Sequence, residues 1–403
     1  MRTTWKSRTI AMGLVALGLG VAVVAPGAAP ASAADTVATL PSIPATPRYD
    51  VGVPKSLSTA DAAAVSTATS TAATPVLPHY SAKIKNGTQT FNYSIVGKNP
   101  AVASVTPSTT VKTLVVPLVI KFSNGNSWDP TVKDSCDAGA SALGRTQASP
   151  LFVNQAWTWG GTSIGTGQIT SAFQRAQFWK YAKPTGVNPG YGVQLAKTTL
   201  TKVVINVPAA DAAQGGGVPC GNGLLGAVNI DWLDNYLQGT VMPSLVAKGL
   251  NASTFPLFLV HNVVEYVGTT SNCCVLGYHN AFAPSAGVVQ TYGISTYDNT
   301  SLFNGVADIS TLTHEVGEWM NDPFVANPTK PWGHVGQVSG CQSNFEVGDP
   351  LSGSVFTDKV GTFTYHAQEL AFFSWFYHQN PSIGVNGWYS NQGTFTTPAA
   401  ACV

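Results

Sequence analysis

The spacing of apolar and polar residues divides the chain from about residue 79 onward into short strands and helices. Continuous apolar runs bounded by polar or glycine-containing turns predict buried strands at 114–122, 203–207, 255–260 and 287–297. Apolar residues at helical spacing predict helices at 170–181, 230–248 and 372–378. Because strands and helices do not alternate regularly, the pattern predicts an α+β fold in which a mixed sheet packs on a helix.

A further helix, predicted over residues 309–321, has two distinct faces. A helix turns about 100° per residue, so the side chains of His314, Glu318 and Asp322 lie within about 80° of one another around the helix axis. The opposite face carries only apolar residues, namely Ile309, Leu312, Val316, Trp319 and Met320. Asp308 or Ser310 is expected to cap this helix, and Pro323 to end it. We expect the apolar face to pack on the core and the polar face to line a cleft.

The first 78 residues differ in composition from the rest. Basic residues, an uncharged run over 10–24 and the sequence Ala31-Ser32-Ala33 predict a secretory signal peptide over residues 1–33. Residues 34–78 have too little bulky apolar surface to offset the entropy of ordering, so we expect a disordered leader or propeptide. Residues 79–403 are expected to form one domain. No membrane span is expected after signal cleavage, and the protein is predicted to be secreted.

Charge and cysteine content narrow the possible functions. Only 10% of the residues are charged and the net charge is +1, which argues against nucleic acid or an anionic membrane surface as partner. The six cysteines of an exported chain predict three disulfides. We expect the adjacent Cys273 and Cys274 to bond to two different partners, because a bridge between neighbours strains the peptide that joins them.

The polar face of the 309–321 helix has the residue types of a hydrolytic metal site. In the H-E-x-x-H helix of many zinc enzymes, both His bind the metal and the Glu after the first His is the base. Here His314 and Glu318 are the expected ligands and Glu315 the expected base, with Glu in place of the second His. We expect Zn²⁺ by analogy with these helices. Because carboxylates neutralise more of the ion's charge than imidazoles do, Mn²⁺ or Ca²⁺ are alternatives.

The remaining ligand must come from another segment. Residues 344–350 offer Glu346, the first choice, and Asp349, which could exchange roles with it by orienting His314. His334 is a third candidate, and Asp322 is either an alternative ligand or a hydrogen-bonding support. Five of the 19 acidic residues lie between positions 315 and 349, which favours a metal site over a merely solvated helical face.

These motifs resemble those of known families. The sequence H-E-x-x-E with Asn321-Asp322-Pro323, followed by Glu346-Val347-Gly348-Asp349, resembles bacterial secreted proteins that share this pattern with plant phosphate-induced or exordium-like proteins. The chain also resembles the zincin metallopeptidases, in which a strand precedes the active-site helix. That resemblance implies a zincin-like fold with the ligands and base given above. It also implies that His366 or Tyr365 stabilises an oxyanion.

Other interpretations compete with this one. Residues 161–165 fit the G-x-S-x-G pattern of serine hydrolases, but their flanks predict a loop. Glu315 and Glu346 could be the carboxylate pair of a glycosidase. Our main prediction is a secreted metal-dependent peptidase that hydrolyses extracellular protein or peptides. The alternative is a non-catalytic protein that binds cell-wall glycan, in which the same residues hold a structural metal or form a hydrogen-bonded acid cluster.

Overall fold

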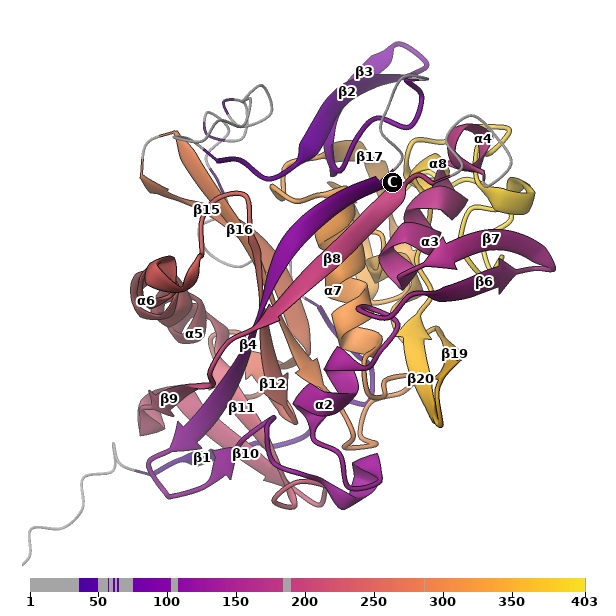
Figure 1. Ribbon diagram of the computed structural model, residues 1–403. Coiled ribbons are helices and arrows are strands. Elements are labelled where there is room, and N and C mark those ends of the chain that lie inside the picture. Colours follow the sequence, from indigo (N-terminus) through magenta and orange to yellow (C-terminus); the bar gives the residue numbers. More distant parts are fainter. Residues whose placement is uncertain are drawn as a thin grey trace, which may run out of the picture. The chain divides into compact units, whose positions relative to one another are not determined.

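The computed structural model describes residues 36–49, 57, 61, 64, 75–102, 108–183, 190–285 and 287–402 (Figure 1). The predicted signal peptide over residues 1–33 lies outside this part of the chain. None of the described helices is long and apolar enough to span a lipid bilayer. The described chain mixes helices and strands, which confirms the expected combination of the two; a zincin-like fold stays a prediction.

A mixed sheet of seven strands forms the centre of the described chain. Its order is β15 (Gly277–Ser285), β16 (Val288–Tyr297), β12 (Phe255–His261), β4 (Ser108–Phe122) and β5 (Ser127–Trp128). The strands β8 (Gly192–Thr199) and β9 (Val203–Val207) pair with successive parts of β4. β4, β8, β9, β12 and β16 are parallel, whereas β15 and β5 are antiparallel to their neighbours. The four strands predicted from apolar runs are confirmed.

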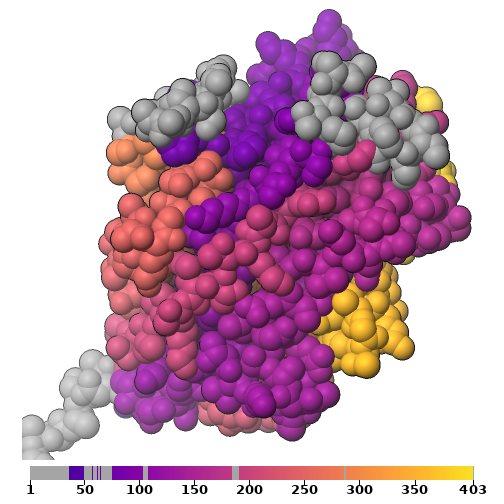
Figure 2. Space-filling view, viewed as in Figure 1, coloured from indigo at the N-terminus to yellow at the C-terminus, as the bar shows by residue number. Residues whose placement is uncertain are grey.

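The helix predicted over 309–321 is α7 (Ser310–Asn321), which packs on β15 and β16. Trp319 on its apolar face stacks on Phe255 with ring centroids 3.8 Å apart, and its indole N–H donates to Thr291. Other sides of α7 contact β3 (Gln89–Val96) and β20 (Phe363–Gln368). In Figure 1 the strands β4 and β8 lie in front of α7. In the space-filling view from the same side, purple and magenta segments hide α7 (Figure 2).

Two expectations about α7 are wrong. Every residue of this helix is buried, so its polar face lines no cleft but faces other protein groups. Ile309 occupies the N-cap position, and no side chain caps the helix. Asp308 accepts hydrogen bonds from the backbone N–H groups of Ile309 and His366, and the Ser310 hydroxyl accepts one from Ala307. The side chains of Asp308 and Ser310 therefore accept hydrogen bonds from backbone groups outside the first turn of α7 and do not cap the helix.

Shorter sheets surround this core in the described chain. One has five strands, β1 (Ala38–Thr39), β10 (Ala212–Gly216), β11 (Leu224–Asn229), β13 (Val263–Tyr266) and β14 (Cys273–Val275). The others are the pairs β2 (His79–Asn86) with β3, β6 (Gln155–Trp159) with β7 (Thr162–Gly167), β17 (Pro328–Val335) with β18 (Val338–Asn344), and β19 (Val355–Val360) with β20. Residues 161–165 therefore belong to a hairpin, and the strand-to-helix turn of a nucleophile elbow is absent there.

The remaining helices of the described chain are short. They are α2 (Ala142–Gln147), α3 (Ile169–Gln177), α4 (Trp179–Ala182), α5 (Ile230–Tyr236), the π-helical η4 (Leu237–Val241), α6 (Met242–Leu245) and α8 (Phe373–Phe376). Single 3₁₀ turns are η2 (Ser135–Asp137), η3 (Ala209–Asp211), η5 (Val246–Lys248), η6 (Asp349–Leu351) and η7 (Val385–Gly387). The helices predicted within 170–181, 230–248 and 372–378 are confirmed, although the last is shorter than predicted.

Residues 36–49 pack on the fold, contrary to the expectation of a disordered leader from residue 34. β1 pairs in parallel with β10, and the carbonyl of Arg48 accepts a hydrogen bond from the N–H of Leu276. Leu40 and Tyr49 are each 6% exposed and join the core cluster formed by the five-stranded sheet. Backbone pairing thus holds a segment that has few bulky side chains. We call residues 36–49 the N-terminal strap.

All six cysteines form disulfides within the chain. The pairs are Cys136–Cys220, Cys273–Cys274 and Cys341–Cys402. Three disulfides are thereby confirmed, but the expectation of two different partners for Cys273 and Cys274 is wrong. The other four cysteines pair among themselves, so Cys273 and Cys274 in β14 have no other cysteine with which to form a disulfide.

Candidate metal centre

Three segments bring two histidines and four acids together beneath the surface. α7 contributes His314, Glu315 and Glu318, and the strand β15 contributes His279. Glu346 comes from the loop after β18, and Asp349 from the start of η6. All six side chains are at most 2% exposed. We call them the acid–histidine cluster. The predicted ligands His314, Glu318, Glu346 and Asp349 therefore do meet, as does the predicted base.

The possible ligand atoms form two triads that share Glu318. Within each triad, one ligand atom per residue lies within 4.8 Å of the others. In the His314 triad, Nε2 of His314 lies 3.1 Å from Oε1 of Glu318 and 3.6 Å from Oδ1 of Asp349. In the His279 triad, Nδ1 of His279 lies 3.8 Å from Oε2 of Glu318, and Nε2 lies 3.9 Å from Oε2 of Glu346.

Sequence reasoning missed His279. Its strand alternates, so Gly277, His279 and Ala281 lie on the same face of β15. Gly277 leaves space for the helix, because a Cβ there would lie 3.0 Å from Cγ of Glu315. The available signal was a small residue two positions before and after the histidine, but no strand was predicted there. Nothing in the sequence paired that segment with the 309–321 helix either.

Asp322 supports the cluster from outside it. Its backbone carbonyl lies 3.1 Å from Nε2 of His279, so a proton on Nε2 donates there and leaves the Nδ1 lone pair facing Glu315 and Glu318. The Asp322 carboxylate accepts hydrogen bonds from the backbone N–H groups of Ala326 and Asn327. Asp322 was predicted to be either an alternative ligand or a hydrogen-bonding support. Its hydrogen bonds fit the role of support.

The His314 ring is enclosed from two sides. Tyr49 of the N-terminal strap stacks on it with ring centroids 3.5 Å apart. Gly348 lies over it as well, because a Cβ at that position would come within 2.5 Å of Nδ1. The side chain of Gln337 accepts from the N–H of Tyr49 and donates to its carbonyl and to the carboxylate of Asp349. The strap is thus hydrogen-bonded, through one amide, to a predicted ligand.

Several polar atoms of the cluster have no hydrogen-bond partner among the described residues. They are both ring nitrogens of His314 and both carboxylate oxygens of Glu315 and of Glu346. The 3.1 Å contact of His314 with Glu318 does not have hydrogen-bond alignment. Leaving a buried polar group without a partner costs about 1–3 kcal/mol, and more for a charged one. Imidazole nitrogens and carboxylate oxygens are ligands of Zn²⁺ and Mn²⁺, so these residues fit a bound cation.

Burial and mutual repulsion control protonation in the cluster. Burial, reinforced by Glu318, Asp322 and the other acids, raises the pKa of Glu346 well above its usual value. Burial raises the pKa of Glu315 to about 7, despite the opposing effect of the two histidines. For Glu318, His314 and His279 outweigh burial and lower the pKa. Without a cation, protons would therefore compensate part of the charge that a metal would otherwise balance.

The other predicted site residues have partners outside the cluster. Tyr365 donates its hydroxyl proton to the carbonyl of Arg145, and His366 Nδ1 lies 2.7 Å from Asp308. The structure therefore does not direct either side chain at the cluster as an oxyanion donor. His334 is exposed on β17, beside the Cys341–Cys402 disulfide, whose sulfurs are not available as ligands.

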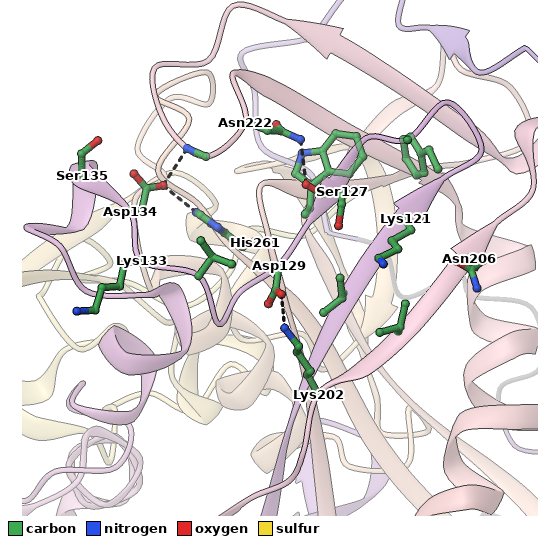
Figure 3. Close-up of a pocket in the computed structure, with 17 residues that line it drawn as sticks. Lys121, Ser127, Asp129, Lys133, Asp134, Ser135, Lys202, Asn206, Asn222 and His261 are labelled. Carbon is green, nitrogen blue, oxygen red and sulfur yellow. Dashed lines mark hydrogen bonds and ion pairs between the residues drawn. The ribbon is translucent and has the colours of Figure 1, made fainter.

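An open pocket of about 840 Å³ lies apart from the cluster, and no cluster residue lines it. Figure 3 shows Asp134 directed at His261 and at the backbone N–H of Gly221, while Lys202 pairs with Asp129 at 2.6 Å. Asp134 and His261 also hydrogen-bond with Asn299. Because these groups satisfy one another, they need no cation.

The chain matches no protein-family model, no curated protein and no solved structure. What can be said of function therefore depends on the chemistry of the cluster.

Proposed function

We propose that the protein is a metal-dependent hydrolase of peptide bonds, with its metal centre in the acid–histidine cluster. The observation that carries the proposal is the carboxylate of Glu315, which is 1% exposed and has no hydrogen-bond partner in the described chain. Its Oε2 lies 3.6 Å from Nδ1 of His279, and its carboxylate also interacts electrostatically with His314, so it lies near both triads. A spare acid beside a set of ligands is the arrangement that hydrolytic metal sites use for proton transfer.

Each residue has a distinct role in this proposal. His314, Glu318 and Asp349, or His279, Glu318 and Glu346, would hold the cation. Zn²⁺ or Mn²⁺ would supply Lewis-acid polarisation of the substrate carbonyl there. Glu315 accepts the proton of the attacking water at its free oxygen and later passes it to the leaving amine. Burial raises the pKa of Glu315 to about 7 in the metal-free chain, and a bound cation would lower this pKa, which favours the ionised form that accepts a proton.

Access to the cluster requires a movement of the protein. All six side chains are at most 2% exposed, and Tyr49 covers His314. We infer that peptide substrates reach the metal centre only after the N-terminal strap leaves the His314 ring. An extracellular protein or peptide is the substrate class that the sequence resemblance implies.

A second candidate function follows from the same burial. A cation enclosed so completely can hold α7, β15 and the 345–349 loop together without catalysis. This would suit a secreted protein that binds cell-wall glycan, with a structural ion. The unpartnered Glu315 favours the hydrolase, whereas the closed surface favours the structural ion.

Metal analysis combined with one isosteric variant distinguishes these functions. The mature protein, and its Tyr49→Ala variant with the strap loosened, are assayed for bound metal and for cleavage of casein and of a peptide library. A hydrolase gives metal in both and cleavage that Glu315→Gln abolishes while metal and fold are retained. The matched control, Asp231→Asn in the first turn of α5 and outside the cluster, leaves cleavage unchanged. Bound metal with no cleavage in either form supports the structural ion, and absence of metal excludes both.

A further inference from the structure

We propose that the acid–histidine cluster binds two divalent cations, bridged by the carboxylate of Glu318. The inference rests on the proposed metal centre, but concerns the number of ions and therefore the class of hydrolytic site. It also gives His279 and Glu346 a role of their own, equivalent to that of His314 and Asp349.

The two oxygens of Glu318 face different triads. Oε1 lies 3.1 Å from Nε2 of His314 and accepts the backbone N–H of Gly348 at 3.0 Å. Oε2 lies 3.8 Å from Nδ1 of His279. The N–H groups of Gly348 and Asp349 both donate to Oε1 and so fix the rotation of the carboxylate. Held in this way, one carboxylate offers one oxygen to each of two ions.

One ion cannot use all the ligands at once. Metal–ligand bonds of about 2.0–2.2 Å place the ligand atoms of a single ion at most about 4.4 Å apart. The five ligand residues do not form a single group even at 4.8 Å, but two triads that have only Glu318 in common. Asp349 belongs to one triad and Glu346 to the other. Two ions, each with one histidine, one terminal acid and a share of Glu318, account for all five.

The unpartnered atoms lie in both triads, which gives an independent reason for two ions. His314 is 0% exposed and neither of its nitrogens is hydrogen-bonded in the described chain; Glu346 is likewise 0% exposed with neither oxygen bonded. An ion in the His314 triad alone would leave Glu346 without a partner. An ion in the His279 triad alone would leave both nitrogens of His314 without a ligand bond or a hydrogen bond, beside Glu318 and Asp349. Leaving either group unbonded would be less favourable in free energy than losing an ordinary hydrogen bond, because both groups lie away from water.

The charges agree with this count. Glu315, Glu318, Glu346 and Asp349 bring four negative charges when ionised, and two divalent cations bring four positive ones. The fifth acid, Asp322, is compensated by backbone N–H groups. A single divalent ion would leave about two of these charges to be compensated by protons instead of by a metal.

The ligand types indicate which ions would bind. Each triad has one imidazole nitrogen and two carboxylates, which suits Zn²⁺ or Mn²⁺ better than Ca²⁺, whose ligands are oxygens. Paired ions about 3.5–4 Å apart are used by hydrolases of amides and phosphoesters, in which both ions stabilise the charge that develops on the substrate. The cluster would thus belong to the two-metal class of hydrolytic sites rather than to the single-zinc class.

The test is the stoichiometry of metal binding to the mature chain. The protein is stripped with chelator, titrated separately with Zn²⁺ and Mn²⁺, dialysed and analysed for bound metal. We expect two ions per chain in the wild type, one in Glu346→Gln, one in Asp349→Asn, and two in Asp231→Asn, a control outside the cluster. Circular dichroism and thermal unfolding establish that each variant is folded.

The electron paramagnetic resonance spectrum of the Mn²⁺-loaded wild type gives a second readout that needs no variant. Two Mn²⁺ ions that share the Glu318 carboxylate should give an exchange-coupled spectrum. One ion per chain, or two ions whose spectrum is uncoupled, would overturn the bridged pair while the proposed hydrolase stands. No bound ion in the folded wild type would overturn the metal centre itself, so the two failures are distinguishable.

Discussion

The ring of Tyr49 lies flat on the imidazole of His314, with centroids 3.5 Å apart and planes inclined by 14°. The two residues are far apart in the sequence, and Tyr49 belongs to a segment whose composition predicted disorder. The stack therefore joins the N-terminal strap to the candidate metal centre. It also covers one side of a residue on which metal binding is proposed to depend.

Removal of this ring should expose the metal centre. In Tyr49→Ala we expect loss of bound metal to a chelator to be at least about tenfold faster, because water gains access to His314, and the free energy of unfolding to fall by about 3 kcal/mol. Chelator-induced metal release, followed by absorbance, measures the first effect, and denaturant unfolding measures the second.

Tyr49→Phe is the matched control. The Tyr49 hydroxyl is buried and has no hydrogen-bond partner in the described chain, so its removal should change stability little. The phenylalanine ring keeps the cover, and metal release should remain slow. Equal release rates for Tyr49→Ala and the wild type would show that the strap does not control access.

Gly348 should not tolerate a side chain. A Cβ there would lie 2.5 Å from Nδ1 of His314, and the same residue donates its N–H to Glu318. We expect Gly348→Ala to displace the loop, to lower the free energy of unfolding by about 1–3 kcal/mol and to reduce metal content. Gly340→Ala on β18 is the control, since nothing lies within 4 Å of a Cβ at that position. Normal metal content in Gly348→Ala would argue against ligation by His314.

His279 is expected to be a ligand even though no sequence motif contains it. His279→Ala should retain fewer ions than the wild type after dialysis, measured by elemental analysis. His261→Ala removes a histidine that is equally buried but hydrogen-bonds outside the cluster, and it should keep the full metal content. If the two variants bind metal equally, the His279 triad does not hold an ion.

Stability of the metal-free protein should fall as the pH rises. The pKa of Glu315 is about 7 and that of Asp349 about 6, above the ordinary values of 4.5 and 3.8, mainly because both are buried. Nearby acids, foremost Glu318, also raise the pKa of His314 against the effect of burial. The folded protein thus binds more protons than the unfolded one between about pH 4 and pH 7, so stability decreases across this window.

Bound metal should remove this dependence, because cations then compensate the carboxylates in place of protons. The melting temperature is to be measured from about pH 5 to about pH 8, with and without metal. The stabilisation by metal should be largest at the upper end. A metal-free melting temperature that rises steadily between about pH 5 and pH 7 would contradict the buried, proton-compensated cluster.

Local patterns predicted α7 and much of the site well. The helical spacing of Leu312, Val316 and Trp319 is a property of a few neighbouring residues, and these side chains do form the apolar face. Glu346 and Asp349 could be associated with the helix because acids are scarce in this chain. The backbone N–H groups at 348 and 349 complete that association by bonding to Glu318.

What the sequence did not reveal depends on pairing between distant segments. His279 reaches the helix only because β15 pairs with β16, on which α7 packs. Tyr49 reaches it because β1 pairs with β10 and because Gln337 binds its backbone. The bond between Cys273 and Cys274 depends on the pairing of four other cysteines. None of these relationships produces a periodic signal in the local sequence.

The Gln337 amide links the N-terminal strap to the candidate metal centre. The same side chain binds the backbone of Tyr49 and the carboxylate of Asp349. If the strap were cut away, the Gln337 amide would lose its bonds to Tyr49 and could reorient while still donating to Asp349. Removal of the N-terminal segment would then alter the coordination sphere directly, and a metal ion in the centre would report by its spectrum whether the chain had been processed.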